Sequence, residues 1–500
     1  MNKILAAALA LTSALMLHAQ SSGSPDMERI VILHTNDTHS QIDPDSKDLG
    51  GILRRKVLID SIRNAEKNVL LIDAGDAVQG SVYFTLFGGE VERKMMNALG
   101  YDYQIMGNHE LDNGVEALAR QWTLAEAGLL STNYDLSGTP LESIVKPYAI
   151  RQIGGRKIGL IAINVDPYGL VSPDNYAGVR YLDGLKAANA TAWHLKHNEK
   201  CDLVIAVTHI GYKSRPGCND CELAAKSEDI DLIIGGHSHT LIDPAGDMGR
   251  QVNAKGDTIL LAQLDKGGAR LGQIVIEPGR KPVAKLILVD RRLDNRIDSA
   301  TAAILNPYRH SVDSILGIPV GKSLADFPHR STQLSNLVSD FVSDKGSALA
   351  SRKVDMAIMN RGGIRCGMPE GAVTKGLMMQ MLPFDNRVVV IEIKGRDLQE
   401  AFDVMAARGG DAISREARAR INKDTRKAEN VEINGEPIDP QRIYLVATID
   451  YLAKGGDYME PLTRGKLVMR SDNLLYDDVM ERIGHLKGKK IKADETQRWY

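Results

Sequence analysis

The sequence predicts an α/β protein in which a layered α/β domain is followed by a smaller α/β domain. A chain of 500 residues is too long for one compact core, so two large domains are expected. Short apolar runs, often β-branched, alternate with longer amphipathic stretches, which is typical of strands buried between helices. The pattern breaks near residues 316–321 and then restarts, which indicates a junction there.

The first twenty residues differ from the rest of the chain. Lys3 precedes an almost wholly apolar run at residues 4–17, and a polar Ser-Ser-Gly-Ser stretch follows. This run is short for a membrane span and typical of a signal peptide, which we assign to residues 1–20. A buried amino-terminal helix or a retained anchor is the alternative. We expect export to the periplasm, with secretion or surface display as variants, and no transmembrane anchor.

Residues 27–295 are expected to form the first domain. Short apolar runs with the length of strands lie at residues 29–34, 69–73, 103–106, 203–207 and 232–234. The stretches between them have room for helices, so this part of the chain predicts layers of helices against a sheet.

Residues 296–320 are expected to link the two domains. Residues 296–316 are predicted to form a helix with Pro307 as a weak point, and Pro319 and Gly321 end it. Residues 321–500 would form the second domain, with apolar runs at 355–359, 387–393 and 443–449. The basic segment at 415–427 contains acidic residues too, which favours a solvated strand and turn over a nucleic-acid patch. The net charge of −2 also gives no reason to expect a nucleic-acid polymer as partner.

The chain has four cysteines, Cys201, Cys218, Cys221 and Cys366. Export would permit a disulfide, and Cys218 and Cys221 could close a small loop. A zinc site would need a second pair, which does not follow. A structural Cys218–Cys221 bridge is slightly favoured over two unpaired thiols.

Polar residues suited to metal binding follow each of the five strands predicted in the first domain. They are Asn36-Asp37-Thr38-His39, Asp73-Ala-Gly-Asp76, Gly107-Asn108-His109-Glu110 with Asp112 behind it, Thr208-His209, and Gly236-His237-Ser238-His239. A lone histidine after a strand is more often structural than a metal ligand. Five such motifs in order, each directly after an apolar run, indicate a shared metal site. Ligand sites in α/β sheets lie at the carboxyl ends of strands, so we expect these motifs to meet in one crevice.

Two metal ions about 3.5–4 Å apart can hold the attacking and leaving oxygens of a phosphoryl displacement and activate water for attack. A bridging carboxylate would offset the repulsion between the ions, and Asp76, after the tight Gly75 turn, is the best candidate. Imidazole and carboxylate ligands suit zinc, manganese or iron better than calcium. The sequence therefore predicts two divalent metal ions as cofactors.

This series of motifs resembles the calcineurin-like metallophosphoesterases. The resemblance implies one metal held by Asp37, His39, Asp76 and His239, and a second held by Asp76, Asn108, His209 and His237. It implies that His109 is a catalytic residue contacting the transferring phosphoryl group. Asp112 would fix the tautomer of His109 and raise its basicity. His34 has no place in the pattern, and we interpret it as structural.

Three turns in the second domain bear on the substrate. Asn360-Arg-Gly-Gly-Ile-Arg365, Pro383-Phe-Asp-Asn386 and Tyr451-Leu-Ala-Lys-Gly-Gly-Asp457 each adjoin a predicted strand. They offer an arginine for anionic oxygens, two aromatic rings for a flat base and an aspartate for ribose hydroxyls. Each feature alone is more often a core residue or a common turn. Aromatic residues make up only 5% of the chain, however, so rings beside turns carry some weight.

The chain from about residue 29 to 458 resembles the secreted bacterial 5′-nucleotidase and UDP-sugar hydrolase family, which joins a dimetal domain to a nucleotide-binding domain. The resemblance implies substrate binding by Asn360 and Arg365, base stacking between Phe384 and Tyr451, and ribose binding by Asp457. Arg330 is a less certain phosphate contact. The family usually has Phe where this chain has Tyr451, whose hydroxyl could tune base preference, and Gly where it has Arg361, which could meet phosphate or face solvent.

The expected function is metal-dependent hydrolysis of nucleoside 5′-monophosphates, with a small-molecule nucleotide as the partner. The same fold could act on 2′,3′-cyclic nucleotides, UDP-sugars or NAD, and the sequence does not separate these. A relative that handles sulfur-oxidation intermediates should not need the aromatic pair. A non-catalytic nucleotide-binding surface protein is disfavoured by the complete ligand set. The family also implies a large swing of the second domain, and nothing in the sequence indicates the oligomeric state.

Overall fold

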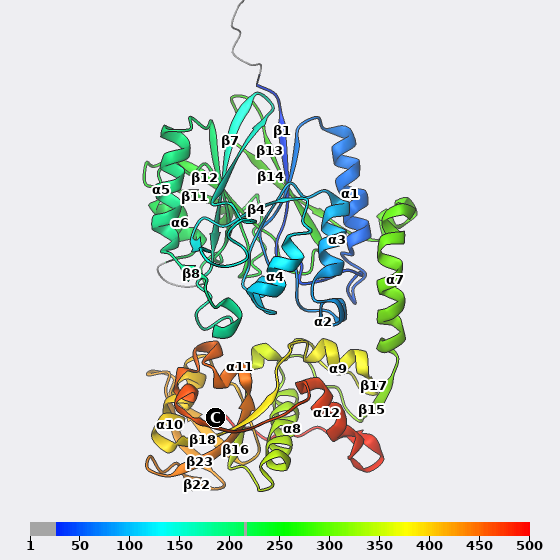
Figure 1. The fold of residues 1–500 in the computed structure, drawn as a ribbon, viewed down its shortest axis with the longest axis vertical. Helices are drawn as coiled ribbons and strands as arrows, with labels where there is room; N and C mark the ends of the chain where they lie inside the picture. The colour runs from blue at the N-terminus through cyan, green and yellow to red at the C-terminus, as the bar shows by residue number, and fades with distance from the viewer. Residues whose placement is uncertain (1–26, 215–217) are drawn as a thin grey trace, which may run out of the picture.

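The computed structural model describes residues 27–214 and 218–500 as two α/β bodies stacked along the long axis of the molecule (Figure 1). The signal peptide expected at residues 1–20 lies outside the described residues. The predicted fold class is confirmed, with the larger layered body first. Among the helices described, none combines the length and apolar character needed to cross a bilayer.

The first body contains two six-stranded sheets. One has the order β14 (Val283–Leu288), β13 (Arg270–Ile276), β1 (Ile30–Thr35), β2 (Val69–Asp73), β3 (Tyr103–Ile105), β4 (Gly128–Leu130). The other has the order β11 (Arg250–Val252), β12 (Thr258–Gln263), β10 (Leu232–Gly235), β9 (Leu203–His209), β7 (Arg156–Asn164), β6 (Tyr148–Ile153). All five predicted strands are confirmed, and they divide between the sheets, with β1, β2 and β3 in one and β9 and β10 in the other.

Alternation along the strands explains why the sheets are covered on both faces. In β1, Ile30 and Ile32 pack between the two sheets, whereas Val31 and Leu33 face the layer of α1 (Ile52–Ala65) and α3 (Glu90–Leu99). In β9, alternate residues likewise face the other sheet or the layer of α5 (Gly184–His197) and α6 (Asp220–Lys226). Strands buried on both faces appear as continuous apolar runs, which is why the sequence reveals them.

The second body is built on a five-stranded sheet. Its order is β19 (Ala412–Ile413), β16 (Met356–Met359), β23 (Ile443–Ile449), β18 (Val388–Lys394), β24 (Lys466–Arg470). Helices α8 (Thr332–Ala350), α10 (Gly395–Ala407) and α12 (Leu475–Gly484) pack around it. The basic segment at 415–427 forms β20 (Ala417–Ile421) and the turn before β21 (Ala428–Ile433), and its arginines pair with Asp344 and Glu429. The predicted surface strand and turn is confirmed.

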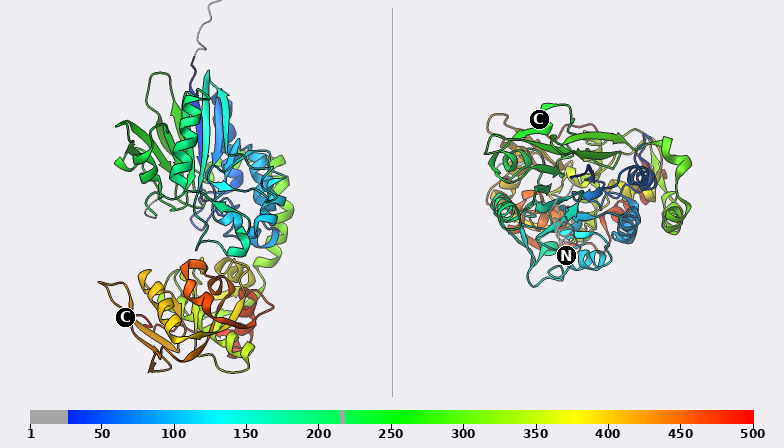
Figure 2. Two further views of the ribbon diagram at one scale, coloured as in Figure 1. Left: turned by 60° about the vertical axis from the view of Figure 1, so that its left-hand side comes forward. Right: turned by 90° about the horizontal axis from the view of Figure 1, so that it is seen from above.

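Helix α7 (Ser299–Leu316) joins the two bodies along one side of the molecule (Figures 1 and 2). It starts three residues later than expected because the Asp298 carboxylate caps it by accepting the N–H groups of Ala300 and Thr301. Pro307 lies inside the helix without ending it. The Tyr308 ring packs on Phe87 of α2 (Val82–Phe87), with 4.9 Å between ring centroids, and Arg309 pairs with Asp43. These contacts hold α7 against the first body.

The slightly favoured Cys218–Cys221 disulfide is not formed. Both residues are free thiols, and they lie near different tyrosines, Cys218 near Tyr181 and Cys221 near Tyr212. Cys221 is already the second residue of α6, whereas Cys218 precedes the Asn219 cap, so their side chains leave the backbone in different environments.

Candidate active site

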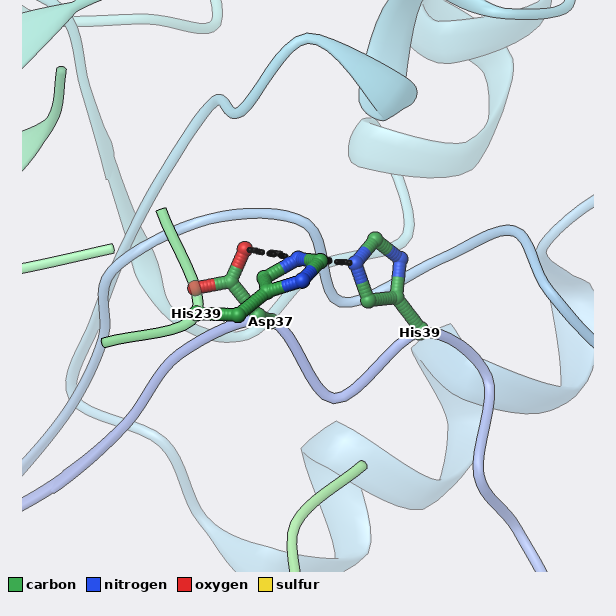
Figure 3. Close-up of side chains that lie close together, drawn as sticks. All are labelled: Asp37, His39 and His239. Atoms are coloured by element: carbon green, nitrogen blue, oxygen red, sulfur yellow. Dashed lines mark hydrogen bonds and ion pairs between the residues drawn. The ribbon is translucent and has the colours of Figure 1, made fainter. Parts of the chain in front are cut away.

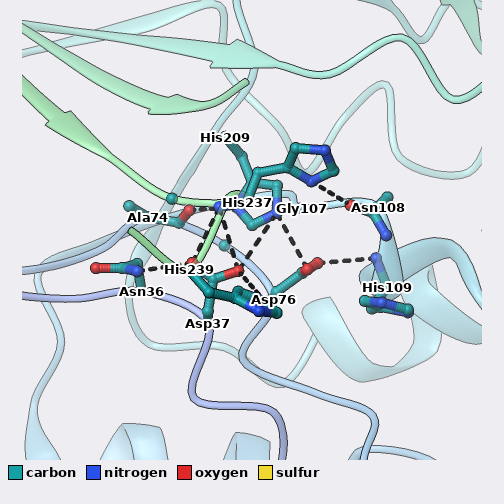
Figure 4. Close-up of polar contacts among 12 residues, drawn as sticks. Asn36, Asp37, Ala74, Asp76, Gly107, Asn108, His109, His209, His237 and His239 are labelled. Carbon is teal, nitrogen blue, oxygen red and sulfur yellow. Dashed lines mark hydrogen bonds and ion pairs between the residues drawn. The ribbon is translucent and has the colours of Figure 1, made fainter. Parts of the chain in front are cut away.

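The strand ends of both sheets meet at one edge of the first body. β1, β2 and β3 run parallel to one another, as do β9 and β10, and the segments that follow them lie side by side (Figure 4). His209 is the last residue of β9, and the other candidate ligands lie in the loops after β1, β2, β3 and β10. The structure therefore brings together all seven predicted metal ligands: Asp37, His39, Asp76, Asn108, His209, His237 and His239.

Five of these seven residues have a left-handed backbone, with φ values of 49° at Asp37, 46° at His39, 54° at Asp76, 76° at His237 and 52° at His239. Such conformations cost non-glycine residues on the order of 1 kcal/mol or more each and cluster at functional sites. Glycines let the loops approach one another. A Cβ on Gly107 would lie 2.1 Å from Oδ1 of Asp76, so any side chain there would displace that carboxylate.

The first ligand cluster is formed by Asp37, His39 and His239 (Figure 3). Nε2 of His239 lies 3.3 Å from Oδ1 of Asp37, and the Nε2 atoms of His39 and His239 lie 3.0 Å apart. Asp37 is fully buried, and its carboxylate also accepts the backbone N–H of His237. Although burial disfavours the charge, His239 and His209 hold the pKa of Asp37 below its usual value.

The second ligand cluster is formed by Asp76, His209 and His237 (Figure 4). Nε2 of His209 lies 3.1 Å from Oδ2 of Asp76, and Nδ1 of His237 lies 2.9 Å from Oδ1 of Asn108. The backbone carbonyl of Ala74 lies 2.7 Å from Nδ1 of His209, which leaves Nε2 directed at Asp76. Asp76 also lies within 4.0 Å of Nε2 of His39, so its carboxylate stands between the two clusters.

The donor set of these clusters fits divalent metal ions. Two buried carboxylates, Asp37 and Asp76, face four imidazoles, and among the described residues neither carboxylate pairs with a lysine or arginine. Buried charges are normally paired or coordinate metals. The Nε2 atoms of His39 and His239 also face each other at 3.0 Å, close enough to bind one ion together. Nitrogen and carboxylate donors of this kind suit zinc, manganese or iron.

His109 lies beside both clusters, in a short 3₁₀ helix at His109–Leu111. Its Nδ1 lies 2.8 Å from Oδ2 of Asp112, and its backbone N–H donates to Oδ1 of Asp76 at 2.9 Å. Burial opposes a charge on this imidazole, but Asp112 and Asp76 outweigh burial and raise the pKa of His109. One ring nitrogen of His109 also falls within 4.8 Å of ligand atoms of His39 and Asp76.

Two residues without a role in the sequence prediction shape the site. The buried Glu110 carboxylate accepts the backbone N–H groups of Gly107, Asp76 and Ala77 and so fixes the loop that carries Asp76. Asn36 donates to Oδ2 of Asp37 at 2.6 Å. Both residues adjoin predicted ligands, and their position inside the same polar motifs is the sequence feature from which a role in the site could have been predicted. His34, by contrast, packs on Gly272 outside both clusters, as a structural residue does.

A cavity of about 810 Å³ lies between the two bodies and joins the metal-ligand clusters to the second body. Asn108, His109, Asp112 and His237 line it on one side. On the other side it is lined by five of the six predicted substrate residues, Asn360, Arg365, Phe384, Tyr451 and Asp457. Arg330, the sixth, is exposed and does not line the cavity. Burial lowers the pKa of the Arg365 guanidinium, and the charge of Arg330 adds to this effect.

The residues of the second body are arranged around Phe384 and Asp457. The Phe384 ring centroid lies 6.1 Å from that of His109, and the Arg365 guanidinium lies 5.7 Å from the same phenyl ring. Nδ2 of Asn360 donates to Oδ2 of Asp457 at 2.7 Å. Arg361 does not line the cavity. Its backbone N–H donates to Asp411, and its side chain is directed toward the carbonyl of Gly409.

Comparisons with known proteins match both bodies. A family model for calcineurin-like phosphoesterases matches residues 30–241, and one for the 5′-nucleotidase C-terminal domain matches residues 316–464. Human 5′-nucleotidase is 27% identical, with 86% of this chain and 83% of that protein covered. Trifunctional nucleotide phosphoesterase protein YfkN of Bacillus subtilis is 27% identical over 93% of this chain, but the chain spans only 34% of its length.

Among solved structures, the 5′-nucleotidase precursor of Thermus thermophilus superposes with a TM-score of 0.83 at 26% identity, covering 94% of this chain and 99% of that one. The matches follow the same order of domains along the chain, and both sets of motifs fall within them. The chain therefore belongs to the 5′-nucleotidase family of hydrolases, in which a calcineurin-like phosphoesterase domain precedes a 5′-nucleotidase C-terminal domain.

Proposed function

We propose that this protein hydrolyses nucleoside 5′-monophosphates to nucleosides and phosphate. The observation that carries the proposal is the shared cavity, which places Phe384 and Arg365 next to His109 and the two ligand clusters. A nucleotide whose base lies in the second body would present its phosphate at the clusters. The related 5′-nucleotidases support the same reaction class.

Two divalent metal ions would complete the site, one held by Asp37, His39, Asp76 and His239 and the other by Asp76, Asn108, His209 and His237. Such ions supply activated water and neutralise the oxygens of the transferring phosphoryl group. The proposal is supported by the mutual proximity of these donor atoms and the shared position of Asp76.

The remaining roles belong to side chains that line the cavity. Arg365 would bind the phosphate oxygens, and its approach to Phe384 limits the directions in which its donors can point. Phe384 and Tyr451 would stack on the base, and Asp457 would accept the ribose hydroxyls. His109 would stabilise the charge that develops on the phosphoryl group, with Asp112 fixing its ring.

The decisive test is turnover by purified protein that has been stripped of metal and reloaded with zinc or manganese. Phosphate release would be measured with AMP and UMP. Chromatography of the nucleotide products would follow cleavage of a 2′,3′-cyclic nucleotide, a UDP-sugar and NAD, because that cleavage does not itself release phosphate. We expect metal-dependent release from AMP and UMP. A metal-loaded protein that leaves both monophosphates intact would overturn the proposal, and turnover of another panel member in their place would identify the alternative substrate.

We also propose export to the periplasm, on the basis of the basic start and apolar run in the first twenty residues. Amino-terminal sequencing of protein recovered from the periplasm would test this. Cleavage near residue 20 is expected, and an intact Met1 would contradict it.

A further inference from the structure

One loop of the metal-binding body reaches both the catalytic and the substrate residues. It runs from residue 166 to 176, between β7 and β8 (Arg180–Tyr181), and we call it the bridging loop. Its backbone carbonyl at Gly169 accepts the N–H of Asp457 at 2.8 Å. The Tyr451 hydroxyl lies 3.3 Å and 3.2 Å from the carbonyl oxygens of Gly169 and Leu170. The loop therefore holds two predicted substrate residues of the other body.

The far end of the bridging loop is fixed beside the predicted catalytic pair. Nδ2 of Asn175 donates to the backbone carbonyl of Asp112 at 2.5 Å, and Asp112 in turn holds Nδ1 of His109 at 2.8 Å. Residues Leu170, Val171, Ser172 and Asn175 line the cavity between these two ends. The loop thus spans the distance from the Asp112 backbone to the nucleoside-binding residues along one wall of the cavity.

The contact between the bridging loop and the second body is tight. Gly169 has a φ of 75°, and a Cβ built on it would lie 2.2 Å from Cε1 of Tyr458. A side chain at this position would therefore have to displace the Tyr458 ring of the second body. At the rim, Lys454 forms an ion pair with the Asp174 carboxylate. Both side chains of this ion pair are exposed, so the pair adds little to the contact.

The Tyr451 hydroxyl is fully engaged by these contacts. Besides the two carbonyls it lies 3.1 Å from Oδ1 of Asp457 and accepts the Asp457 N–H at 3.1 Å. Burial and the Asp457 carboxylate raise the pKa of Tyr451, so the hydroxyl remains a donor. A hydroxyl used in this way is not available to a base. Its contacts differ from the base-tuning role that the sequence suggested for it.

We propose that the bridging loop is a clasp, which holds the nucleoside-binding residues in a fixed position relative to His109. Its positioning residues are Gly169, Asn175 and Tyr451, the last through its hydroxyl. The inference rests on the proposed hydrolysis of nucleotides. A nucleoside monophosphate must contact both bodies at once, so it depends on the clasp. A small ester such as p-nitrophenyl phosphate has no nucleoside, so Arg365 is the one residue of the second body that it would contact under the proposed function.

Gly169→Ala tests the clasp, and Gly138→Ala is its matched control. Both glycines lie in loops of the same body with nearly equal φ, 75° and 78°, but a Cβ on Gly138 would meet nothing within 4 Å. Both variants therefore carry the same backbone strain, and only Gly169→Ala pushes on the second body. We expect Gly169→Ala to lower kcat/KM for AMP about 10-fold or more, as the loss of two or three hydrogen bonds would, with a much smaller change for p-nitrophenyl phosphate. Gly138→Ala should match the wild type on both.

Tyr451→Phe keeps the ring and removes the hydroxyl. It therefore distinguishes a hydroxyl that holds the clasp from a hydroxyl that recognises the base. We expect KM to rise by the same factor for AMP and UMP, with their ratio of kcat/KM unchanged, and small-angle X-ray scattering to show a more extended molecule. A changed AMP-to-UMP ratio without extension would make the hydroxyl a base reader and overturn the clasp. So would Gly169→Ala kinetics equal to those of Gly138→Ala. Failure of the wild type to hydrolyse AMP would instead reject the proposed function.

Discussion

Asp76 is the residue on which both ligand clusters depend, because its carboxylate faces His39 in one and His209 in the other. Its left-handed backbone is held by Glu110, which accepts the Asp76 N–H at 3.0 Å. Asp76→Asn replaces a shared anionic ligand with a neutral amide that bridges poorly. We expect metal content, measured by mass spectrometry of the metals, and phosphate release to fall together. A variant that keeps two ions per chain and near-normal turnover would contradict the shared ligand.

His109 differs from the ligand residues in having a carboxylate partner of its own, Asp112. His109→Asn should therefore lower kcat by roughly 10²–10⁴-fold while both metals stay bound, the range for a lost charge-stabilising or acid–base group. Asp112→Asn should be milder, because it leaves the imidazole in place and alters only its orientation and basicity. Since one nitrogen of His109 also lies near His39 and Asp76, loss of a metal in His109→Asn is the result that would make it a ligand instead.

The Phe384 ring lies near two residues with different predicted roles, the catalytic His109 and the phosphate-binding Arg365. Stacking of a base on an aromatic ring contributes about 1–3 kcal/mol, so Phe384→Ala should raise KM for AMP and for UMP roughly 5- to 150-fold. Ribose 5-phosphate has no base and should be affected less. Equal losses on all three substrates would show that the ring supports Arg365 and does not bind the base.

At the scale of elements, most of the strands were predictable because they are apolar runs, often β-branched, that are buried on both faces, as Ile30–Leu33 shows. Their division between two sheets was not. It depends on pairings between distant segments, such as Ile30 with Ile276, that local periodicity does not encode. The candidate ligands were visible because each follows a strand. The motif marks Glu110 as a residue near the site, but its role was hidden because its partners are backbone N–H groups, which carry no sequence signal.

The bridging loop was hidden from sequence reasoning for a similar reason. Its contacts with Asp457 and Tyr451 are made by the carbonyls of Gly169 and Leu170, and any residue presents a carbonyl. The thiols of Cys218 and Cys221 show the converse case. Their close spacing in the sequence suggested a disulfide, but none is formed, because the start of α6 places the two residues beside different tyrosines.

Strand β1 contains a buried titratable group that predicts a pH effect on stability. Burial lowers the pKa of His34 from 6.5 to about 4. The unfolded chain therefore binds a proton at His34 near pH 6.5, whereas the folded chain does so only near pH 4. As the pH falls through this window the unfolded state is favoured, by about 1.4 kcal/mol per pH unit and about 3 kcal/mol in all.

His34→Gln cannot titrate and should lose this contribution. Urea unfolding at pH 7, 6 and 5 would compare the two proteins. We expect the free energy of unfolding of the wild type to fall more steeply with decreasing pH than that of the variant. Parallel curves would mean that His34 is protonated at the same pH in both states.

At the scale of the whole molecule, α7 and the bridging loop connect the two bodies on opposite sides of the substrate cavity. The helix is held to the first body by Tyr308 and Arg309, whereas the loop holds the second body through Asp457 and Tyr451. The helix contacts do not involve the cavity. Opening of the cavity would therefore break the loop contacts and leave the helix attached, which makes α7 the expected hinge and the loop the expected point of release.

Metal binding should stabilise the whole fold, because the ligands come from the ends of five strands in two sheets and are assembled only when the first body is folded. An ion that binds only the folded state at a free concentration about 1,000 times its Kd contributes about 4 kcal/mol. For a body of this size each kcal/mol shifts Tm by roughly 2 °C or more, so removal of one such ion by a chelator should lower Tm by about 8 °C and removal of both by about 16 °C. Zinc or manganese should restore it.

Asp76→Asn supplies the control for this effect, because its ligand clusters lack the shared carboxylate. Its Tm should respond weakly to chelator, because clusters without the shared carboxylate hold little metal for the chelator to remove. Differential scanning calorimetry of both proteins, with and without chelator, would measure the four values. A wild-type Tm that stays the same after the chelator has removed both ions would show that metal binding does not stabilise the fold.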